Sequence, residues 1–347
     1  MHEQRLAGEP FDTPAQVVGW LGAMQAQEHA EAKWSIAERT RACTDADVEE
    51  AFGRGEILRT HVLRPTWHFV TPADIRWLLA LSAPRVHAAN RYWYRQSGLD
   101  DAVLARSHEV FRGALEAGEP LLRTELAEAL TLAGVEEAKG LRMGYIAIHA
   151  ELEGLICSGP RRGKQHTYML LDERVPEAEE LTREQALAAL TLRYFQSHGP
   201  ATVKDFSWWS GLTVADVKAG LEAVRDELES EEDDEGTPWF SSSQSAPEGP
   251  VPSAFLIPMY DELGVAYRNL RMVLAEQPPR EGLLERPIVI DGETVGSWKR
   301  TLTKRSATIH ATLFTSLSKA QAAALDIVVE RFGAFTGLPA SLELTPP

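Results

Sequence analysis

Two glutamines, Gln25 and Gln27, flank Ala26 and carry the side chains of the chain that first suggest chemistry. A glutamine amide is neither a strong acid nor a strong base, but it offers two N–H donors and one carbonyl acceptor. The pair could hold a water molecule or the edge of a nucleobase without adding charge. A triplet this short recurs by chance, so by itself it is more simply read as two solvated or cap-adjacent glutamines.

Two segments with helical character surround the triplet. Before it, Val17, Trp20, Leu21 and Met24 recur at i, i+3, i+4 and i+7, which predicts an amphipathic helix. A second helix is expected after it, with apolar positions between residues 32 and 37. The junction between these helices collects the polar residues Gln25, Gln27, Glu28, His29 and Glu31.

The next segments predict a helix and then a hairpin. Thr44 is the expected N-cap of a third helix, and residues 57–72 (ILRTHVLRPTWHFVTP) are rich in β-branched and aromatic side chains. Arg64-Pro65-Thr66 interrupts that stretch, as a hairpin turn would. Three helices followed by a hairpin is the order of a winged helix, with the hairpin as its wing. A longer helix is expected from Pro72 to about Tyr94, kinked at Pro84.

The same layout recurs further along the chain. Residues 104–116, 121–134 and 141–159 predict three helices, and residues 160–171 (PRRGKQHTYMLL) predict a second hairpin with a basic tip. Another cycle of three helices begins at Thr182, whereas its wing is unclear. The acidic run 226–235 and the Ser/Pro/Gly-rich stretch 237–252 are expected to form a loop or linker. Low-identity repeats of winged-helix units explain this layout.

The last part of the chain differs in pattern. Short β-rich segments and the turn signal Asp291-Gly292 predict a small sheet or partly closed barrel, followed by a final helix over residues 318–337. That helix is expected to pack through Ala323, Leu325, Ile327, Val328 and Phe332. The predicted fold is therefore mainly α with α+β units: tandem winged-helix motifs, a small C-terminal β-barrel or sheet, and a terminal helix. The expected domains are residues 1–100, 101–180, 181–240 and 241–347.

Composition limits the class of protein. The 347 residues include 44% hydrophobic residues, enough for two or three domains with real cores. The net charge of −16 argues against binding nucleic acid over the whole surface, because phosphate neutralisation needs Lys and Arg. The basic residues cluster, however, so a basic channel on an acidic body is possible. No apolar run is long enough to span a bilayer, and the start resembles neither a signal nor a transit peptide, which indicates a cytoplasmic protein.

Cofactor and metal motifs do not stand out. Cys43 and Cys157 lack neighbouring cysteines at metal spacing and are expected to be reduced thiols. His61, His68, His87 and His310 show no metal-ligand spacing, and no phosphate-binding glycine motif occurs. The sequence thus predicts no zinc and no cofactor.

Four segments together resemble a known family. They are GAMQAQEHAEAKWSIAER (22–39), LRPTWHFVTPADIRWLL (63–79), GPATVKDFSWWSGL (199–212) and LIPMYDELGVAYR (256–268). In this order they look like the winged-helix DNA glycosylases of the AlkZ/YcaQ type. That resemblance implies tandem winged helices and a C-terminal β-barrel around a DNA channel. It also implies excision of bulky N-alkylated purines and unhooking of interstrand crosslinks.

The resemblance also assigns catalytic residues. The family signature, Gln, an apolar residue, then Gln or Asp, falls on Gln25, Ala26 and Gln27, the version similar to crosslink-specific self-resistance enzymes. An N-alkylated purine is a cationic leaving group, so the enzyme mainly has to position a water beneath C1′ and shield the cation. Which group takes the proton of that water stays open, with Glu28 and Glu31 as candidates. Lys33 is the sole lysine near the triplet, so monofunctional hydrolysis is expected without a Schiff-base step.

Both hairpins are candidates for DNA contact. In the first, Arg64, Thr66 and His68 could contact phosphate, or they could simply complete the turn around a packed Trp67. In the second, the candidates are Arg161, Arg162, Lys164 and Gln165, with His166 beside them. Elsewhere, an ion pair between Asp261 and Arg268 is expected, and Trp208 and Trp209 are expected in the core.

We expect a monomeric DNA glycosylase acting on double-stranded DNA with alkyl lesions, in repair or natural-product self-resistance, and nucleoid-associated when acting. No membrane partner is expected. Winged helices also serve regulators, so a non-catalytic DNA-binding protein or transcriptional regulator is the alternative. A third possibility is an interaction module whose acidity has abolished DNA affinity.

Overall fold

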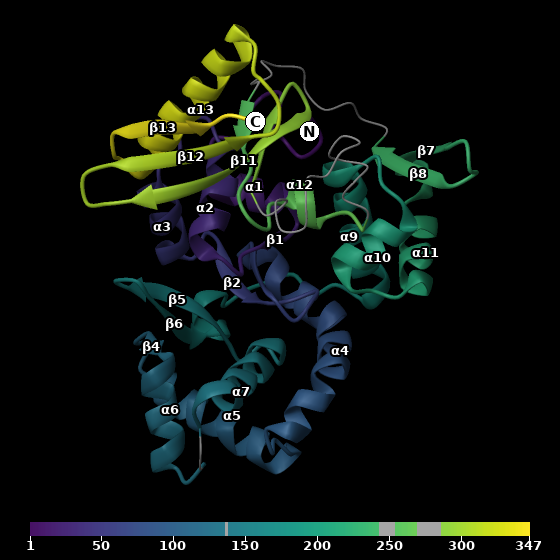
Figure 1. Ribbon diagram of the computed structural model, residues 1–347. Helices are drawn as coiled ribbons and strands as arrows, with labels where there is room; N and C mark the ends of the chain where they lie inside the picture. The colour runs from purple at the N-terminus through teal and green to yellow at the C-terminus, as the bar shows by residue number, and fades with distance from the viewer. Residues whose placement is uncertain (136–137, 243–253, 269–285) are drawn as a thin grey trace.

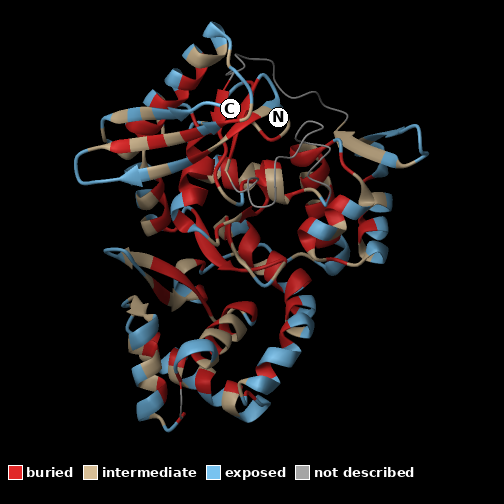
Figure 2. Ribbon diagram, viewed as in Figure 1, coloured by how far each residue is buried: buried red, intermediate tan, exposed pale blue. Residues whose placement is uncertain are grey.

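The computed structural model describes residues 1–135, 138–242, 254–268 and 286–347. The chain is mixed α/β and ends in a small sheet (Figure 1). The second part of the chain forms a lobe below the rest in this view, and the long helix α4 (Pro72–Gln96) leads into it. Buried residues follow the inward faces of the helices, and exposed residues line the outer faces (Figure 2).

The first part of the chain builds a three-stranded antiparallel sheet of order β1-β3-β2. Its elements are α1 (Pro14–Leu21), β1 (Met24–Gln25), α2 (His29–Ala37), α3 (Asp45–Arg54), β2 (Leu58–His61) and β3 (Trp67–Val70). The hairpin and the Thr44 cap of α3 are confirmed. The first helix ends earlier than its apolar periodicity suggests, because Gly22 closes α1 and Met24 joins a strand. Gln25 is therefore held by a sheet.

The second part repeats this arrangement with a sheet of order β4-β6-β5. Helix α4 runs through Pro84 and is followed by α5 (Asp101–Leu115), β4 (Leu121–Leu122), α6 (Arg123–Leu132), α7 (Gly140–Leu152), β5 (Ile156–Arg162), β6 (Gln165–Leu170) and α8 (Leu171–Arg174). The predicted helix over residues 141–159 was too long. Gly154 ends it with a positive φ, and Gly159 lies in β5, where a Cβ would come within 2.8 Å of Thr167 and Met169.

The third part contains α9 (Arg183–His198), α10 (Val203–Ser210), α11 (Val214–Ala223), a short 3-10 turn (Arg225–Glu227), β7 (Leu228–Glu232) and β8 (Pro238–Ser242). The acidic run was wrongly expected to be a loop or linker, since most of it forms β7 and the turn to β8. Asp233 stabilises that turn by accepting hydrogen bonds from the backbone of Glu235 and Thr237 and from the Trp239 indole. Residues 243–252 of the expected linker lie outside the described residues.

The C-terminal part forms a five-stranded sheet of order β13-β12-β11-β10-β9. Its elements are β9 (Ala254–Leu256), α12 (Glu262–Val265), β10 (Pro287–Ile290), β11 (Glu293–Leu302), β12 (Ala307–Leu313), α13 (Lys319–Thr336) and β13 (Ala340–Thr345). The final helix is confirmed and packs through Leu325, Val328 and Phe332, but Ala323 and Ile327 are exposed and were wrongly placed in its buried face. Strand β13, parallel to β12, was not expected.

Buried polar contacts fix the C-terminal part to the first part. The Arg39 guanidinium donates to both carboxylate oxygens of Asp261 at 2.8 and 2.9 Å, and both side chains are fully buried. The predicted pair of Asp261 with Arg268 is therefore wrong, because Arg39 from α2 occupies the carboxylate. The Trp34 indole also donates to the Leu256 carbonyl at 2.8 Å.

Two smaller expectations have mixed outcomes. Cys43 and Cys157 are free thiols, as predicted. Trp209 is fully buried, whereas Trp208 is 53% exposed and was wrongly assigned to the core. Among the described residues, no helix has the length and apolar character needed to cross a membrane.

Candidate active site

Gln25 is fixed on both its backbone and its side chain. Its backbone N–H donates to the Glu262 carboxylate at 2.8 Å, and its side-chain oxygen accepts from the Arg64 guanidinium at 3.0 Å. In the sheet, Gln25 lies opposite His68. The strand of the triplet and the first hairpin therefore form one structural unit, which brings together Gln25, Arg64 and His68.

Gln27 lies at a junction between two hollows. One has a volume of about 220 Å³ and the other about 380 Å³, and both are lined by Gln27, Trp67, Arg123 and Tyr168. His61 and Tyr145 help line the smaller hollow. The larger is completed by the second hairpin through Lys164, Gln165 and His166, together with Arg59. Gln27 therefore borders a concave region with aromatic walls and several cations, on a chain of strongly acidic composition.

Arg64 and its neighbours in the first turn are partly enclosed. Burial lowers the pKa of Arg64, but its guanidinium stays cationic at neutral pH and bonds Gln25. The preceding Leu63 has a φ of 62°, a conformation costly for leucine, and Ser82 holds its backbone N–H at 3.0 Å. Thr66 is half-buried, and its hydroxyl has no hydrogen-bond partner among the residues that the structure describes.

His68 is fully buried under the first hairpin, so the structure gives it a packing position and no exposed surface for a phosphate. Its Nδ1 lies 3.0 Å from the Thr66 carbonyl. Burial, followed by the nearby Arg64, lowers the pKa of His68 well below its ordinary value. His68 is therefore neutral at physiological pH.

A carboxylate and an imidazole meet beside Gln27. The buried Glu151 of α7 lies 2.5 Å from His61 Nδ1, and its other oxygen accepts from the Trp67 indole at 3.3 Å. The Arg59 guanidinium lies over the Trp67 ring, 4.2 Å from its centroid, and donates to the Ala26 carbonyl at 3.0 Å. Burial lowers the pKa of Arg59 to about 10, so it remains charged. These contacts fix Trp67 and the backbone of the triplet together.

The polar residues of the second hairpin differ in whether they already have a partner within the protein. Arg161 bonds Glu49 and the Lys164 carbonyl, and Arg162 bonds Glu125 and the Pro120 carbonyl. Lys164 and Gln165 are exposed and line the larger hollow. Lys164 is therefore placed to reach a ligand there, whereas the two arginines already have carboxylate partners.

The acidic candidates for proton transfer differ in environment. Glu28 is exposed at the start of α2. Glu31 is buried and forms ion pairs with Arg286 and Arg300 at 3.2 and 2.9 Å, so it is neither a surface residue nor free. Lys33 is also buried, with its amine 2.9 Å from the carboxylates of Asp45 and Glu49.

Two histidines next to the triplet are kept neutral. The rings of His29 and His166 lie with centroids 4.9 Å apart. Burial is the main reason that the pKa of His29 is far below its ordinary value and that the pKa of His166 falls to about 4, with the Arg59 and Arg161 charges adding to both effects. They add no positive charge to the site at neutral pH.

Comparison with known proteins assigns the chain to a family. Residues 18–335 match the family described as DNA glycosylase AlkZ-like. The chain belongs to this family. It is accordingly a DNA glycosylase, a hydrolase that acts on N-glycosyl bonds in DNA repair.

Two matches to AlkZ-like proteins support the assignment. The chain is 28% identical over 327 residues to the interstrand DNA cross-link repair glycosylase of Streptomyces sahachiroi, covering 85% of each chain. Its fold matches the solved structure of the Streptomyces sahachiroi DNA glycosylase AlkZ with a TM-score of 0.80 and 22% identity, over 99% of this chain and 97% of that one. The shared fold extends over nearly the entire chain.

Sequence reasoning missed two residues, Glu262 and Glu151, that contact Gln25 and His61 of the candidate site. Glu262 lies 237 positions from Gln25, and Glu151 lies 90 positions from His61. Neither has a local motif. The local signal available was that Glu151 is the single acidic residue of α7, in GLRMGYIAIHAEL.

Proposed function

We propose that this glycosylase removes N-alkylated purines from double-stranded DNA, with bulky adducts and interstrand crosslinks among its lesions. The observation that carries the proposal is the position of Gln27 at the junction of the two hollows. The Streptomyces sahachiroi relative named for interstrand cross-link repair adds to it, since it is similar over most of both chains. An enzyme that removes such lesions would serve in DNA repair or in self-resistance to a DNA-alkylating natural product.

Gln25 and Gln27 position the attacking water. Arg64 occupies the side-chain oxygen of Gln25, so Gln25 can offer its amide N–H groups to the water or to the sugar. Gln27 is half-buried at the rim of both hollows and can offer either end of its amide. A water held by two oriented amides attacks C1′ with a large gain from proximity, while the alkylated base already departs as a good leaving group.

His61 is our candidate for accepting the proton of the water. The oxygen of water bonds to C1′, the C1′–N bond breaks, and its electron pair neutralises the cationic purine. The released proton moves to the imidazole of His61, whose Nδ1 is already engaged by Glu151 at 2.5 Å. A buried carboxylate stabilises the imidazolium that forms. The exposed Glu28 is the competing candidate.

DNA contacts are assigned to both hairpins. Arg64 and Thr66 of the first are proposed to approach the backbone near the lesion, and Lys164, Gln165, Arg161 and Arg162 of the second to contact phosphates beside it. His68, which is buried beneath the first hairpin, is proposed to support that hairpin and not to contact a phosphate itself. Arg59, Arg123 and Lys164 around the larger hollow supply local positive charge.

We also propose that three winged-helix units, residues 1–100, 101–180 and 181–240, precede a C-terminal unit, residues 241–347. The sheet orders β1-β3-β2 and β4-β6-β5 are the same. In the third unit, the bridge between Ala201 and Phe240 takes the place of the short first strand. The enzyme is proposed to act as a cytoplasmic, nucleoid-associated monomer.

The test is base release from duplex oligonucleotides that carry N7-methylguanine, a bulky N7-alkyl adduct or a crosslink, under single-turnover conditions. Gln27→Ala and Gln25→Ala are expected to lose about 100-fold or more in rate while DNA binding persists. Gln96→Ala, at an exposed glutamine of α4, is the matched control. If both variants release the base within about twofold of the wild-type rate, the side-chain amides of Gln25 and Gln27 do not contribute to catalysis.

A further inference from the structure

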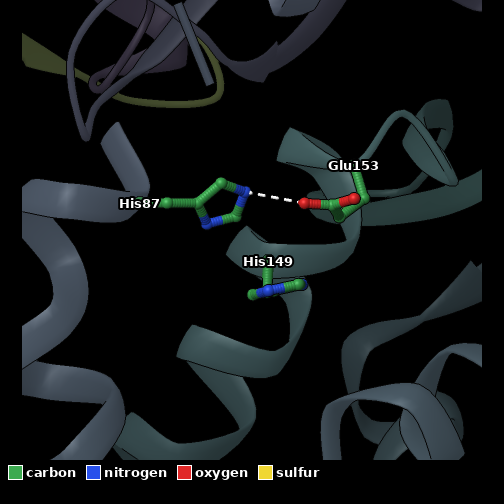
Figure 3. A group of neighbouring side chains, drawn as sticks. All are labelled: His87, His149 and Glu153. Atoms are coloured by element: carbon green, nitrogen blue, oxygen red, sulfur yellow. Dashed lines mark ion pairs between the residues drawn. The ribbon is translucent and has the colours of Figure 1, made fainter. Parts of the chain in front are cut away.

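Three side chains away from the glutamine triplet converge between helices α4 and α7. His87 comes from α4, His149 from α7, and Glu153 from the end of α7 (Figure 3). One donor atom from each lies within 4.8 Å of the donor atoms of the other two. His149 and Glu153 are four residues apart at one helix end, so they lie on the same face.

The distances suit a small divalent ion. His87 Nε2 lies 3.0 Å from Glu153 Oε1, yet within the described part of the chain this nitrogen has no hydrogen bond of proper geometry. A tetrahedral zinc ion with bonds of about 2.1 Å needs donor atoms about 3.4 Å apart. The His87 and Glu153 atoms, 3.0 Å apart, are about 0.4 Å closer than that, and the His149 donor lies within 4.8 Å of both, so small side-chain movements would bring all three to zinc distances.

The rings of His87 and His149 each contact a neighbouring side chain through the second ring nitrogen, as zinc-ligating histidines do. His87 Nδ1 lies 3.0 Å from the Tyr94 hydroxyl, which leaves Nε2 for the ion. His149 Nδ1 lies 3.2 Å from His108 Nε2, which leaves the Nε2 atom of His149 to bind the ion. Ligating histidines nearly always engage their second ring nitrogen in this way, because the bond fixes the tautomer and the ring orientation.

The charge of the cluster also favours a cation. The Glu153 carboxylate lies beside the two imidazoles, so the cluster offers an anionic oxygen and two ring nitrogens to the same ion. His87 and Glu153 border a surface hollow of about 370 Å³, which gives an ion and its water access.

We propose that His87, His149 and Glu153 bind one zinc ion, with water as the fourth ligand and Tyr94 and His108 as positioning residues. The sequence expectation of no metal considered spacing along the chain, and this cluster joins residues of two helices. The zinc would tie α4 to the end of α7, the helix that also carries Glu151 beside Gln27. This inference does not depend on the lesion or on the roles of Gln25 and Gln27.

The test uses the full chain, stripped of metal with a chelator and titrated with zinc against a chromophoric competitor. One equivalent is expected to bind, and Co²⁺ in its place is expected to give the intense visible absorption of a tetrahedral site. His149→Ala and Glu153→Gln should weaken binding at least about tenfold, and Tyr94→Phe by a smaller factor. Zinc should raise the Tm of wild type and not that of Glu153→Gln.

The matched control is His310→Ala. His310 Nδ1 lies 3.0 Å from Glu343 in another His–Glu pair, one that is more exposed and is not part of the three-residue cluster. Glu153 is half-exposed, so Glu153→Gln should retain the fold, which circular dichroism will confirm. Equal zinc affinity of wild type, His149→Ala and Glu153→Gln, or an octahedral Co²⁺ spectrum, would overturn the proposal.

Discussion

The carboxylate of Glu262 accepts a hydrogen bond from the backbone N–H of Gln25 at 2.8 Å, although the two residues are 237 positions apart. Its other oxygen accepts from the Trp209 indole at 2.7 Å. One buried side chain from α12 therefore connects the glutamine triplet, the third part of the chain and the C-terminal part. Its removal should affect both the stability of the fold and the geometry of the site.

We expect Glu262→Ala to lower the free energy of unfolding by about 2–5 kcal/mol, because two buried donors lose their acceptor. Base release should fall at least about tenfold at a temperature where the variant is still folded, since Gln25 loses its backbone anchor. Denaturant unfolding and single-turnover assays measure the two effects. Glu293→Ala, at an exposed position of β11, should change neither. A fully active, destabilised Glu262→Ala would limit Glu262 to a structural role.

The role of His61 can be separated from that of Glu28. His61→Asn should reduce the rate of base release about 100-fold, which is within the range for loss of a general base. Glu151→Gln should reduce it by a smaller factor, because the imidazole loses a charged partner and keeps its position. Glu28→Gln should stay near the wild-type rate. A large loss of rate in Glu28→Gln with a near wild-type rate in His61→Asn would instead indicate that Glu28 accepts the proton.

Phosphate contacts should appear in the salt dependence of DNA binding. Lys164→Ala should weaken binding across sequences and reduce the slope of log K against log salt by about 1. Arg162→Ala should have a smaller effect, because Glu125 already pairs with this guanidinium. Lys319→Ala, at an exposed position of α13, is the control. An unchanged slope in Lys164→Ala would show that the second hairpin stays away from DNA phosphates.

The free energy of unfolding should fall as the pH rises into mild alkali, because the buried Glu38 carboxyl then has to ionise. Burial raises its pKa to about 8, despite Arg331 and Arg39 nearby, and Asp261 adds to the increase. The folded state thus keeps a proton that the unfolded chain releases near pH 4.5, so stability is full below that pH and declines as pH rises towards 8. Glu38→Gln can keep the bond from the Leu256 N–H and should remove on the order of 2–4 kcal/mol of this decline. Denaturant unfolding at pH 5 and pH 8 tests it. An equal decline in wild type and variant would contradict the assignment.

The sequence predicted the local structure well where the signals were local. The helices expected after the triplet, from Thr182 and over residues 318–337 correspond to α2, α9 and α13, Thr44 is the observed N-cap of α3, and Arg64-Pro65-Thr66 lies in the observed turn. It misplaced elements where tertiary contacts decided the outcome. Residues 156–159 pair with β6 and so leave the helix, and the acidic β7 forms because β8 lies opposite it.

The candidate site shows the same division. The triplet and the hairpin turn could be proposed from residue types, and the family match supports the enzyme class. The partners that orient them could not be proposed, because Glu262, Glu151 and Arg300 are far from Gln25, His61 and Glu31 in sequence. A buried ion pair such as Arg39–Asp261 likewise leaves no periodic signal, and the local ion pair expected for Asp261 was wrong for that reason.

The Arg39–Asp261 pair also bears on how the enzyme is made. Its members are 222 residues apart, and synthesis proceeds at roughly 5–20 residues per second, so Arg39 emerges from the ribosome about ten seconds or more before its partner. A nascent chain that ends before residue 261 lacks both Asp261, the partner of Arg39, and Glu262, the partner of the Gln25 backbone. Premature termination should therefore yield products without an assembled glutamine site.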